Sequence, residues 1–198
     1  MHRSLPNSLP LKAALLVIDV QRAIDHPNWG ERNNPQAEQN IAALLRVWRT
    51  SGRPIYHVRH DSTEPESHYR PAQPGHDFKA EAQPFPGEII IPKQTNSAFI
   101  GTDLERRLRQ ANQNTLVVTG VITNNSVEAT VRMAGNLEFD TFLVEDATFT
   151  FGRQDWNGVF RSASEVHAMS LANLDGEYCT VVRTVDLLLS ARSQQEHP

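Results

Sequence analysis

Cysteine is almost absent from this chain of 198 residues: Cys179 is the only one, so the chain can form neither an internal disulfide nor a thiolate metal cluster. Sparse cysteine fits a reducing compartment, and we expect a cytoplasmic protein. No apolar run approaches the roughly 18 residues of a membrane span, and the N-terminus lacks the pattern of a secretory signal. Basic residues are not in excess, since 19 Lys and Arg against 23 Asp and Glu give a net charge of −4. We therefore expect no nucleic-acid partner and no membrane partner.

Several motifs that carry well-known chemistry are also missing. The sequence contains no HExxH, GxGxxG, GxxxxGK(S/T) or GxSxG pattern, which argues against a zinc protease, a dinucleotide site, a P-loop and a serine-hydrolase elbow. The segment His57–Asp61 has metal-ligand residue types, but if it were extended like a strand its two histidines would point to opposite faces. We expect no metal and no cofactor.

What is present is the composition of a globular domain, with 39% hydrophobic and 21% charged residues. The length favours a single domain over residues 1–198, with its core at about 13–183. Short apolar runs alternate with amphipathic segments. The runs predict strands at 13–18, 54–59, 88–91, 115–119, 141–144 and 178–182. The segments predict a helix from an Asn34-Pro35 cap to Ser51-Gly52, and helices at 103–111, 126–137, 164–174 and 185–191.

Residues 60–87 break this alternation, because they are polar and hold Pro65, Pro71, Pro74, Pro84 and Pro86. A long irregular loop of this kind is usually functional or disordered. Strands that alternate with helices elsewhere in the chain predict an α/β fold, with a mainly parallel six-stranded sheet covered by helices on both faces.

Ligands of such sheets bind beyond the carboxyl ends of the strands. The residues that follow predicted strands are Asp19 with Gln21, Arg59–Asp61, Lys93, Gly120–Ser126 and Glu145-Asp146. Each also has an ordinary structural interpretation. Asp19 suits a helix cap or an ion pair, Lys93 a solvated surface position, and Ser126 a helix N-cap.

Three motifs in this order resemble those of the isochorismatase-like hydrolases, also called cysteine hydrolases. They are Leu16–Gln21, Pro92-Lys93 with Asn96–Phe99, and Thr119–Val121 with Ser126–Thr130, and the resemblance runs from about residue 13 to 183. It implies a three-layer α/β/α Rossmann-like domain that is commonly a homodimer or homotetramer. A single mass by light scattering at the monomer value would contradict such an assembly.

The resemblance also implies a catalytic Asp, Lys and Cys, which map to Asp19, Lys93 and Ser126. It implies a cis peptide bond at Val121-Ile122, and an oxyanion held by main-chain N–H groups near Ile122 and Ser126. Its substrates are small amide or carbamoyl compounds with a non-peptide C–N bond. Pocket residues are expected at Gln21, Trp29, Tyr69, Phe149 and Phe151. Asp61-Ser62-Thr63 lacks the histidine of the nicotinamidase metal motif, so the metal set is expected to be empty.

Serine in place of the family's cysteine leaves three interpretations open. Ser126 can be an engineered replacement of a catalytic cysteine, which would make this chain a low-activity amidohydrolase. It can be a natural serine, as in true isochorismatases, where an acidic Asp cleaves a vinyl ether without a nucleophile. The chain can also be a small-molecule-binding protein without catalysis. A carboxylate is a poor base for a hydroxyl, and triads normally give serine a histidine.

Overall fold

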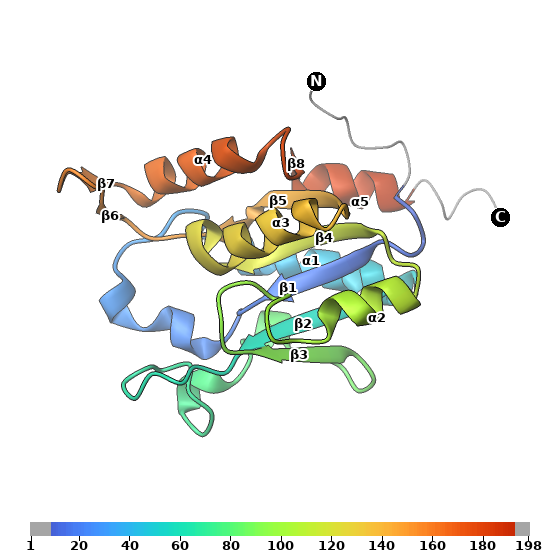
Figure 1. Cartoon of the computed structure of the whole chain (residues 1–198), viewed down its shortest axis with the longest axis horizontal. Coiled ribbons are helices and arrows are strands. Elements are labelled where there is room, and N and C mark those ends of the chain that lie inside the picture. Colours follow the sequence, from blue (N-terminus) through green and yellow to red (C-terminus); the bar gives the residue numbers. More distant parts are fainter. Residues whose placement is uncertain (1–8, 193–198) are drawn as a thin grey trace.

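The computed structural model describes residues 9–192, whose main feature is a sheet in the order β3-β2-β1-β4-β5-β8 (Figure 1). Neighbouring strands in this sheet are parallel throughout. The strands are β1 (Ala14–Ile18), β2 (Ile55–His60), β3 (Ile89–Lys93), β4 (Thr115–Val121), β5 (Asp140–Phe149) and β8 (Thr180–Val182). The helices are α1 (Ala37–Thr50), α2 (Leu104–Gln110), α3 (Glu128–Asn136), α4 (Ala163–Leu174) and α5 (Thr184–Arg192).

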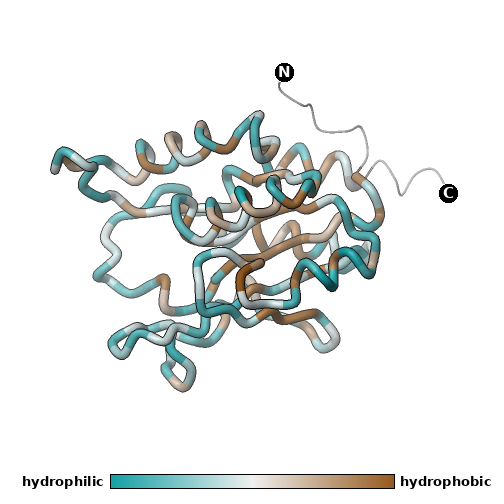
Figure 2. The backbone as a smooth tube through the Cα atoms, in the orientation of Figure 1, coloured by the Kyte–Doolittle hydropathy of each residue, from teal (hydrophilic) through white to brown (hydrophobic). Residues whose placement is uncertain are grey.

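Helices cover both faces of the sheet and make three layers. One apolar cluster packs α2, α3 and α4 on one face, and a second packs α1 and α5 on the other. Hydrophobic residues concentrate in the strands between them, of which β1 is apolar throughout, whereas the outer loops are mostly hydrophilic (Figure 2). The predicted α/β/α fold with a parallel six-stranded sheet is therefore confirmed.

The Pro-rich segment 60–87 is irregular as predicted, with only two single 3-10 turns, η3 (Pro74–His76) and η4 (Ala80–Ala82). Two further 3-10 turns, η1 (Arg22–Asp25) and η2 (Pro27–Trp29), follow β1. η1 and η3 pack together beyond the carboxyl end of β1, where the sequence places the ligand, whereas η4 packs against α1.

Two predicted boundaries are wrong for the same reason. Asn34 does not cap α1, which begins at Ala37; its side-chain amide instead donates to the carbonyls of Glu145 and Thr148, at 2.8 and 2.7 Å. Glu145-Asp146 does not follow a strand, because β5 continues to Phe149 through an irregularity opposite β4. A local pattern cannot reveal a polar cross-link between segments more than a hundred residues apart.

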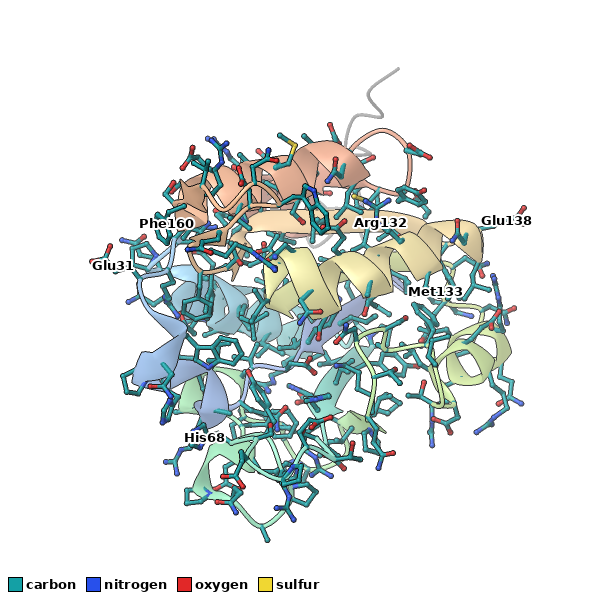
Figure 3. The ribbon with its side chains drawn as sticks, turned by 60° about the vertical axis from the view of Figure 1, so that its left-hand side comes forward. Glu31, His68, Arg132, Met133, Glu138 and Phe160 are labelled. Carbon is teal, nitrogen blue, oxygen red and sulfur yellow. The ribbon has the colours of Figure 1, made fainter. Side chains whose placement is uncertain are left out.

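Two other features differ from the sequence prediction. Ser126 is not an N-cap, because α3 begins at Glu128, and a wide turn, η5 (Thr123–Val127), precedes it. A short antiparallel hairpin, β6 (Arg153–Gln154) with β7 (Phe160–Arg161), was not predicted, since two-residue strands carry no periodic signal. Phe160 extends from this hairpin into solvent (Figure 3).

Cys179 lies just before β8 rather than inside it and packs into the cluster beneath α3 and α4. Burial raises the pKa of its thiol to about 12. Within residues 9–192, no helix is long and apolar enough to cross a membrane.

Gly120 sets how closely β4 approaches β1. Its φ of +117° is rarely adopted by other residues, and a Cβ built there would lie 2.2 Å from the Ile18 carbonyl oxygen. Gly120 pairs with Ile18 in the sheet, directly before Asp19. A glycine at this position therefore lets the ends of the two central strands meet.

The substitution Gly120→Ala is expected to destabilise the fold by roughly 3–5 kcal/mol, because the added methyl group meets rigid backbone on the neighbouring strand. Gly158→Ala is the matched control: Gly158 also has a positive φ, of +80°, but open space around the built Cβ. It should lose only about 1–2 kcal/mol. Equal losses in urea unfolding would show that strain in φ, rather than the approach of β4 to β1, explains the glycine.

Candidate active site

The structure brings Asp19, Lys93 and Ser126 into contact at the carboxyl end of the sheet. Lys93 Nζ donates to Asp19 Oδ2 at 2.6 Å and to Ser126 Oγ at 3.3 Å. All three residues are buried, Lys93 with 2% and Asp19 with 4% of the residue surface exposed. The alternative in which Lys93 is a solvated surface lysine is therefore wrong.

Asp19 reaches Lys93 because its backbone breaks the alternation of the strand. Side chains of successive strand residues point to opposite faces, so a regular Asp19 would point away from the face of Ile18. Ile18 packs with Val58 and Ile91 on the face covered by α2 and α3, the face that Lys93, two residues after Ile91, shares. The φ of Asp19 is +53°, a left-handed value uncommon outside glycine, and it redirects the chain.

The ammonium group of Lys93 is fully hydrogen-bonded, because its third donor contacts the Thr95 carbonyl at 3.0 Å. Asp19 is less well satisfied: its Oδ1 is buried and has no hydrogen-bond partner in the described part of the chain. Burial raises the pKa of the Asp19 carboxyl above its ordinary value, and the opposing attraction of Lys93 does not cancel this effect. A raised pKa and a free oxygen suit a group that exchanges a proton with a ligand.

Thr130 fixes the turn that carries Ser126. Its hydroxyl donates to the Ser126 carbonyl at 2.7 Å and accepts from the Ala98 N–H at 3.0 Å, and it is fully buried. This one side chain links the second and third sequence motifs. The peptide bond Val121-Ile122, just before the turn, is cis as expected.

Four of the five predicted pocket residues gather beside this centre. Tyr69, Phe149 and Phe151 pack with Val121 and Ile122 in one apolar cluster. Trp29 stacks on Phe151 with ring centroids 5.5 Å apart. The pKa of Tyr69 is raised well above its ordinary value, first by burial and then by the charges of Asp19 and Asp25.

The fifth predicted pocket residue, Gln21, is fully buried and makes hydrogen bonds to the backbone. Its amide donates to the carbonyls of His60 and His76, at 3.1 and 2.9 Å, and accepts from the His60 N–H at 2.7 Å. These bonds connect the end of β2 to the Pro-rich loop. Because they use both N–H groups and the oxygen of the amide, the Gln21 side chain has no free donor for a substrate.

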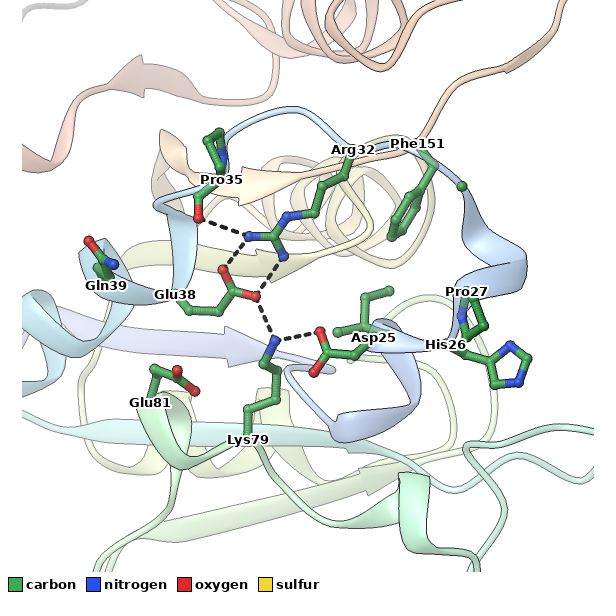
Figure 4. A pocket seen from close by; sticks show the side chains of 12 residues that line it. Asp25, His26, Pro27, Arg32, Pro35, Glu38, Gln39, Lys79, Glu81 and Phe151 are labelled. Carbon is green, nitrogen blue, oxygen red and sulfur yellow. Dashed lines mark hydrogen bonds and ion pairs between the residues drawn. The ribbon is translucent and has the colours of Figure 1, made fainter.

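A network of ion pairs lies beside the aromatic cluster and lines a cavity of its own (Figure 4). Glu38 accepts two bonds of 2.6 Å from Arg32 and one of 2.8 Å from Lys79, which also donates to Asp25 at 2.6 Å. Arg32 lies over the Phe149 ring, 3.8 Å from its centroid. These residues line a cavity of about 410 Å³ that also includes Phe151. The network therefore joins the Pro-rich loop, α1 and the aromatic wall.

Glu38→Gln should lower the free energy of unfolding by about 2–4 kcal/mol at neutral pH, and the melting temperature by roughly 5–15 °C, because it leaves partly buried cations underpaired. Burial alone would raise the pKa of Glu38, but the bonds from Arg32 and Lys79 lower it to about 2. Glu38 thus stabilises the fold above the unfolded pKa of 4.5, and this contribution is lost as the pH falls towards 2.

The difference between parent and Glu38→Gln melting temperatures should therefore shrink on acidification. Glu81→Gln is the control, because Glu81 lines the same cavity but is exposed. A difference that stays constant from neutral to acid pH would rule out the ion pairs as its source.

Sequence reasoning missed several residues that shape the site, among them Thr95, Thr130, Arg32, Glu38 and Lys79. It singled out His60 within Arg59–Asp61 as following a predicted strand, but it gave His60 no catalytic role. The role of Thr130, by contrast, depends on contacts that no local pattern encodes.

Comparison with known proteins identifies the family and the fold. Residues 13–184 match the family profile described as Isochorismatase domain. The isochorismatase family protein YrdC of Bacillus subtilis is 43% identical over 177 residues, covering 89% of this chain and 95% of that protein. The ureidoacrylate amidohydrolase RutB of Cronobacter turicensis is 30% identical over 178 residues, covering 72% of this chain and 77% of RutB.

Among solved structures, an isochorismatase-family protein from Chromobacterium violaceum is 59% identical. It superimposes with a TM-score of 0.92, over 96% of this chain and all of that one. An isochorismatase from Pseudomonas putida is 32% identical with a TM-score of 0.83, over 93% of this chain and 94% of its own. The match spans nearly the whole described fold and all three motifs. The chain belongs to the isochorismatase family of hydrolases.

Proposed function

We propose that this chain hydrolyses the C–N bond of a small, uncharged amide or carbamoyl compound. The observation that carries the proposal is the buried contact of Lys93 with both Asp19 and Ser126, beside the aromatic cluster of Tyr69, Phe149 and Phe151. In such a site the residue at position 126 attacks the carbonyl carbon, and Asp19 accepts its proton. The carbonyl oxygen becomes an oxyanion near the main-chain N–H groups of Ile122 and Ser126. The C–N bond then breaks, and the leaving nitrogen takes the proton from Asp19.

An uncharged substrate is favoured because the cations around the pocket already have carboxylate partners. Lys93 is paired with Asp19 at 2.6 Å, and Arg32 with Glu38 at the same distance. Lys79 contacts Asp25 and Glu38 at 2.6 and 2.8 Å. A substrate carboxylate would have to compete with these pairs, whereas a neutral amide can pack against the aromatic rings.

The similarity to RutB supports a carbamoyl substrate, but ureidoacrylate carries a carboxylate. Ammonia release from ureidoacrylate and from its methyl ester tests the proposal directly, since the two compounds differ in charge and share the C–N bond. We expect the ester to be the better substrate for the purified chain and for its Ser126→Cys variant. Preference for the acid by either form would contradict the uncharged class, and no ammonia from either compound would argue against carbamoyl substrates.

A second candidate is vinyl-ether hydrolysis, because the raised pKa of Asp19 also suits a general acid. In that reaction Asp19 would protonate the substrate without a nucleophile. Turnover of isochorismate that survives Ser126→Ala and disappears in Asp19→Asn would establish it. Isochorismate carries two carboxylates, however, and the paired cations described above disfavour it. Tight binding of a neutral amide without turnover by any variant would instead identify a binding protein.

A further inference from the structure

His60 ends the strand that lies between the two strands carrying Asp19 and Lys93. In the sheet it is the register partner of Lys93, so the two side chains point to the same face. Its backbone is held at both the N–H and the carbonyl by the buried Gln21 amide. The sheet register with Lys93 and the hydrogen bonds from Gln21 therefore fix the position of the His60 ring beside the candidate active site.

The imidazole of His60 is unusual because neither of its ring nitrogens has a hydrogen-bond partner among the described residues, and Nδ1 is fully buried. The other partly or fully buried histidines each have a partner on at least one ring nitrogen, although Nδ1 of His57 is also unpartnered. His57 contacts Glu88 at 2.8 Å, His76 contacts Asp61 at 2.8 Å, His167 contacts Thr123 at 3.0 Å, and His26 accepts from the Asn28 N–H at 3.3 Å. A buried polar atom left without a partner costs stability and calls for an explanation.

The surroundings of His60 favour the neutral form of its ring. Burial and then Lys93 lower the pKa of its ring below the ordinary value, against the opposing attraction of Asp19 and Asp61, and His76 lowers it further. The Tyr69 ring covers one side at 5.7 Å between centroids. A neutral ring with an unused nitrogen can accept a proton at pH 7.

Hydrolysis of an acyl group on Ser126 needs a base for the attacking water, and His60 offers such a base beside Lys93. We infer that His60 is the base that activates water in the second half of the reaction, an inference that rests on the proposed function. As the water oxygen bonds to the carbonyl carbon of the acyl group on Ser126 Oγ, a water proton moves to His60. The bond from that carbon to Oγ then breaks, and His60 returns the proton to Oγ. The acid is released, and His60 and Ser126 regain their starting states.

The test separates acylation from hydrolysis with p-nitrophenyl acetate, which acylates without needing help for its leaving group. The parent should show a burst of nitrophenolate followed by steady turnover. In His60→Gln the burst should remain, while steady turnover falls by about 10²–10⁴-fold and an acetyl group accumulates on residue 126, as seen by mass spectrometry. Parent turnover should rise with pH through the His60 pKa, and this rise should vanish in the variant.

His68→Gln is the matched control, because His68 is an exposed histidine of the Pro-rich loop that follows β2, and its ring stacks on His26 (Figure 3). It should match the parent. A His60→Ala variant whose turnover is restored by added imidazole would exclude a merely structural role for the ring.

Two results would overturn the inference. The first would leave the proposed function intact, and the second would overturn the proposed function as well. If His60→Gln hydrolyses the acetyl group as fast as the parent and with the same pH profile, His60 is not the base, although the proposed function stands. If neither the parent nor Ser126→Cys acquires an acetyl group at position 126, the nucleophilic function fails and the inference fails with it.

Discussion

Replacing Ser126 by cysteine is expected to raise amide or carbamoyl hydrolysis by several orders of magnitude. A thiol has a reference pKa of about 8.5 and is a far stronger acid than a hydroxyl, so the buried Asp19 carboxylate can deprotonate it. The Lys93 ammonium, 3.3 Å from Oγ in the parent, would stabilise the resulting thiolate. Changes to a nucleophile within a coupled set commonly alter rates on this scale. Ammonia release from a neutral amide panel measures the effect.

Ser126→Ala is the control for this experiment, because it removes the nucleophile without adding volume. It should bind the best amide of the panel and release no ammonia. Equal rates for the serine, cysteine and alanine forms would mean that position 126 takes no part in the chemistry.

Lys93→Met should remove catalysis and destabilise the protein together. The variant leaves the Asp19 carboxylate, 4% exposed, without its cation, which typically costs about 3–5 kcal/mol. For a chain of this length the melting temperature should fall by roughly 10 °C or more. The loss of stability should depend on pH, and the folded-state pKa of Asp19 determines whether it grows or shrinks as the pH rises.

The Asp19 pKa in the folded protein lies above the unfolded reference of 3.8, so the folded state binds this proton more tightly. The stability linked to Asp19 therefore falls as the pH rises through the folded pKa. Lys93→Met raises that pKa further, and its deficit should be smaller at about pH 5 than at about pH 8.

Lys79→Met is the matched comparison, since Lys79 also pairs with two carboxylates but stands outside the contact with Ser126. It should lose stability while keeping measurable turnover. A deficit in Lys93→Met that does not change with pH would show that Asp19 is not the group left unpaired.

The positions of the candidate catalytic residues could be predicted because they follow from topology. Asp19 and Lys93 each end an apolar run, and the carboxyl ends of parallel strands meet at one edge of the sheet. The sequence also predicted the irregular loop that delivers Tyr69 to the pocket. These features depend on patterns within ten or so residues.

What could not be predicted depends on contacts across the fold. The left-handed backbone of Asp19 has no local sequence signature, and without it the carboxylate would point away from Lys93. Asn34 read as a helix cap because its cross-strand partners on β5 are distant in sequence. The Arg32–Glu38–Lys79 network is equally non-local. The sequence therefore predicted the candidate catalytic residues better than it predicted the side chains that position them.

The burial of Cys179 makes the Ser126→Cys variant convenient to study. A thiol whose pKa is about 12 is almost entirely protonated near neutral pH, and it is shielded by the cluster under α3 and α4. Thiol-specific reagents should therefore leave the native protein unmodified. In the variant they should react at the introduced thiol alone, so that one label reports the active fraction of enzyme, the ionisation of its nucleophile and protection by bound substrate.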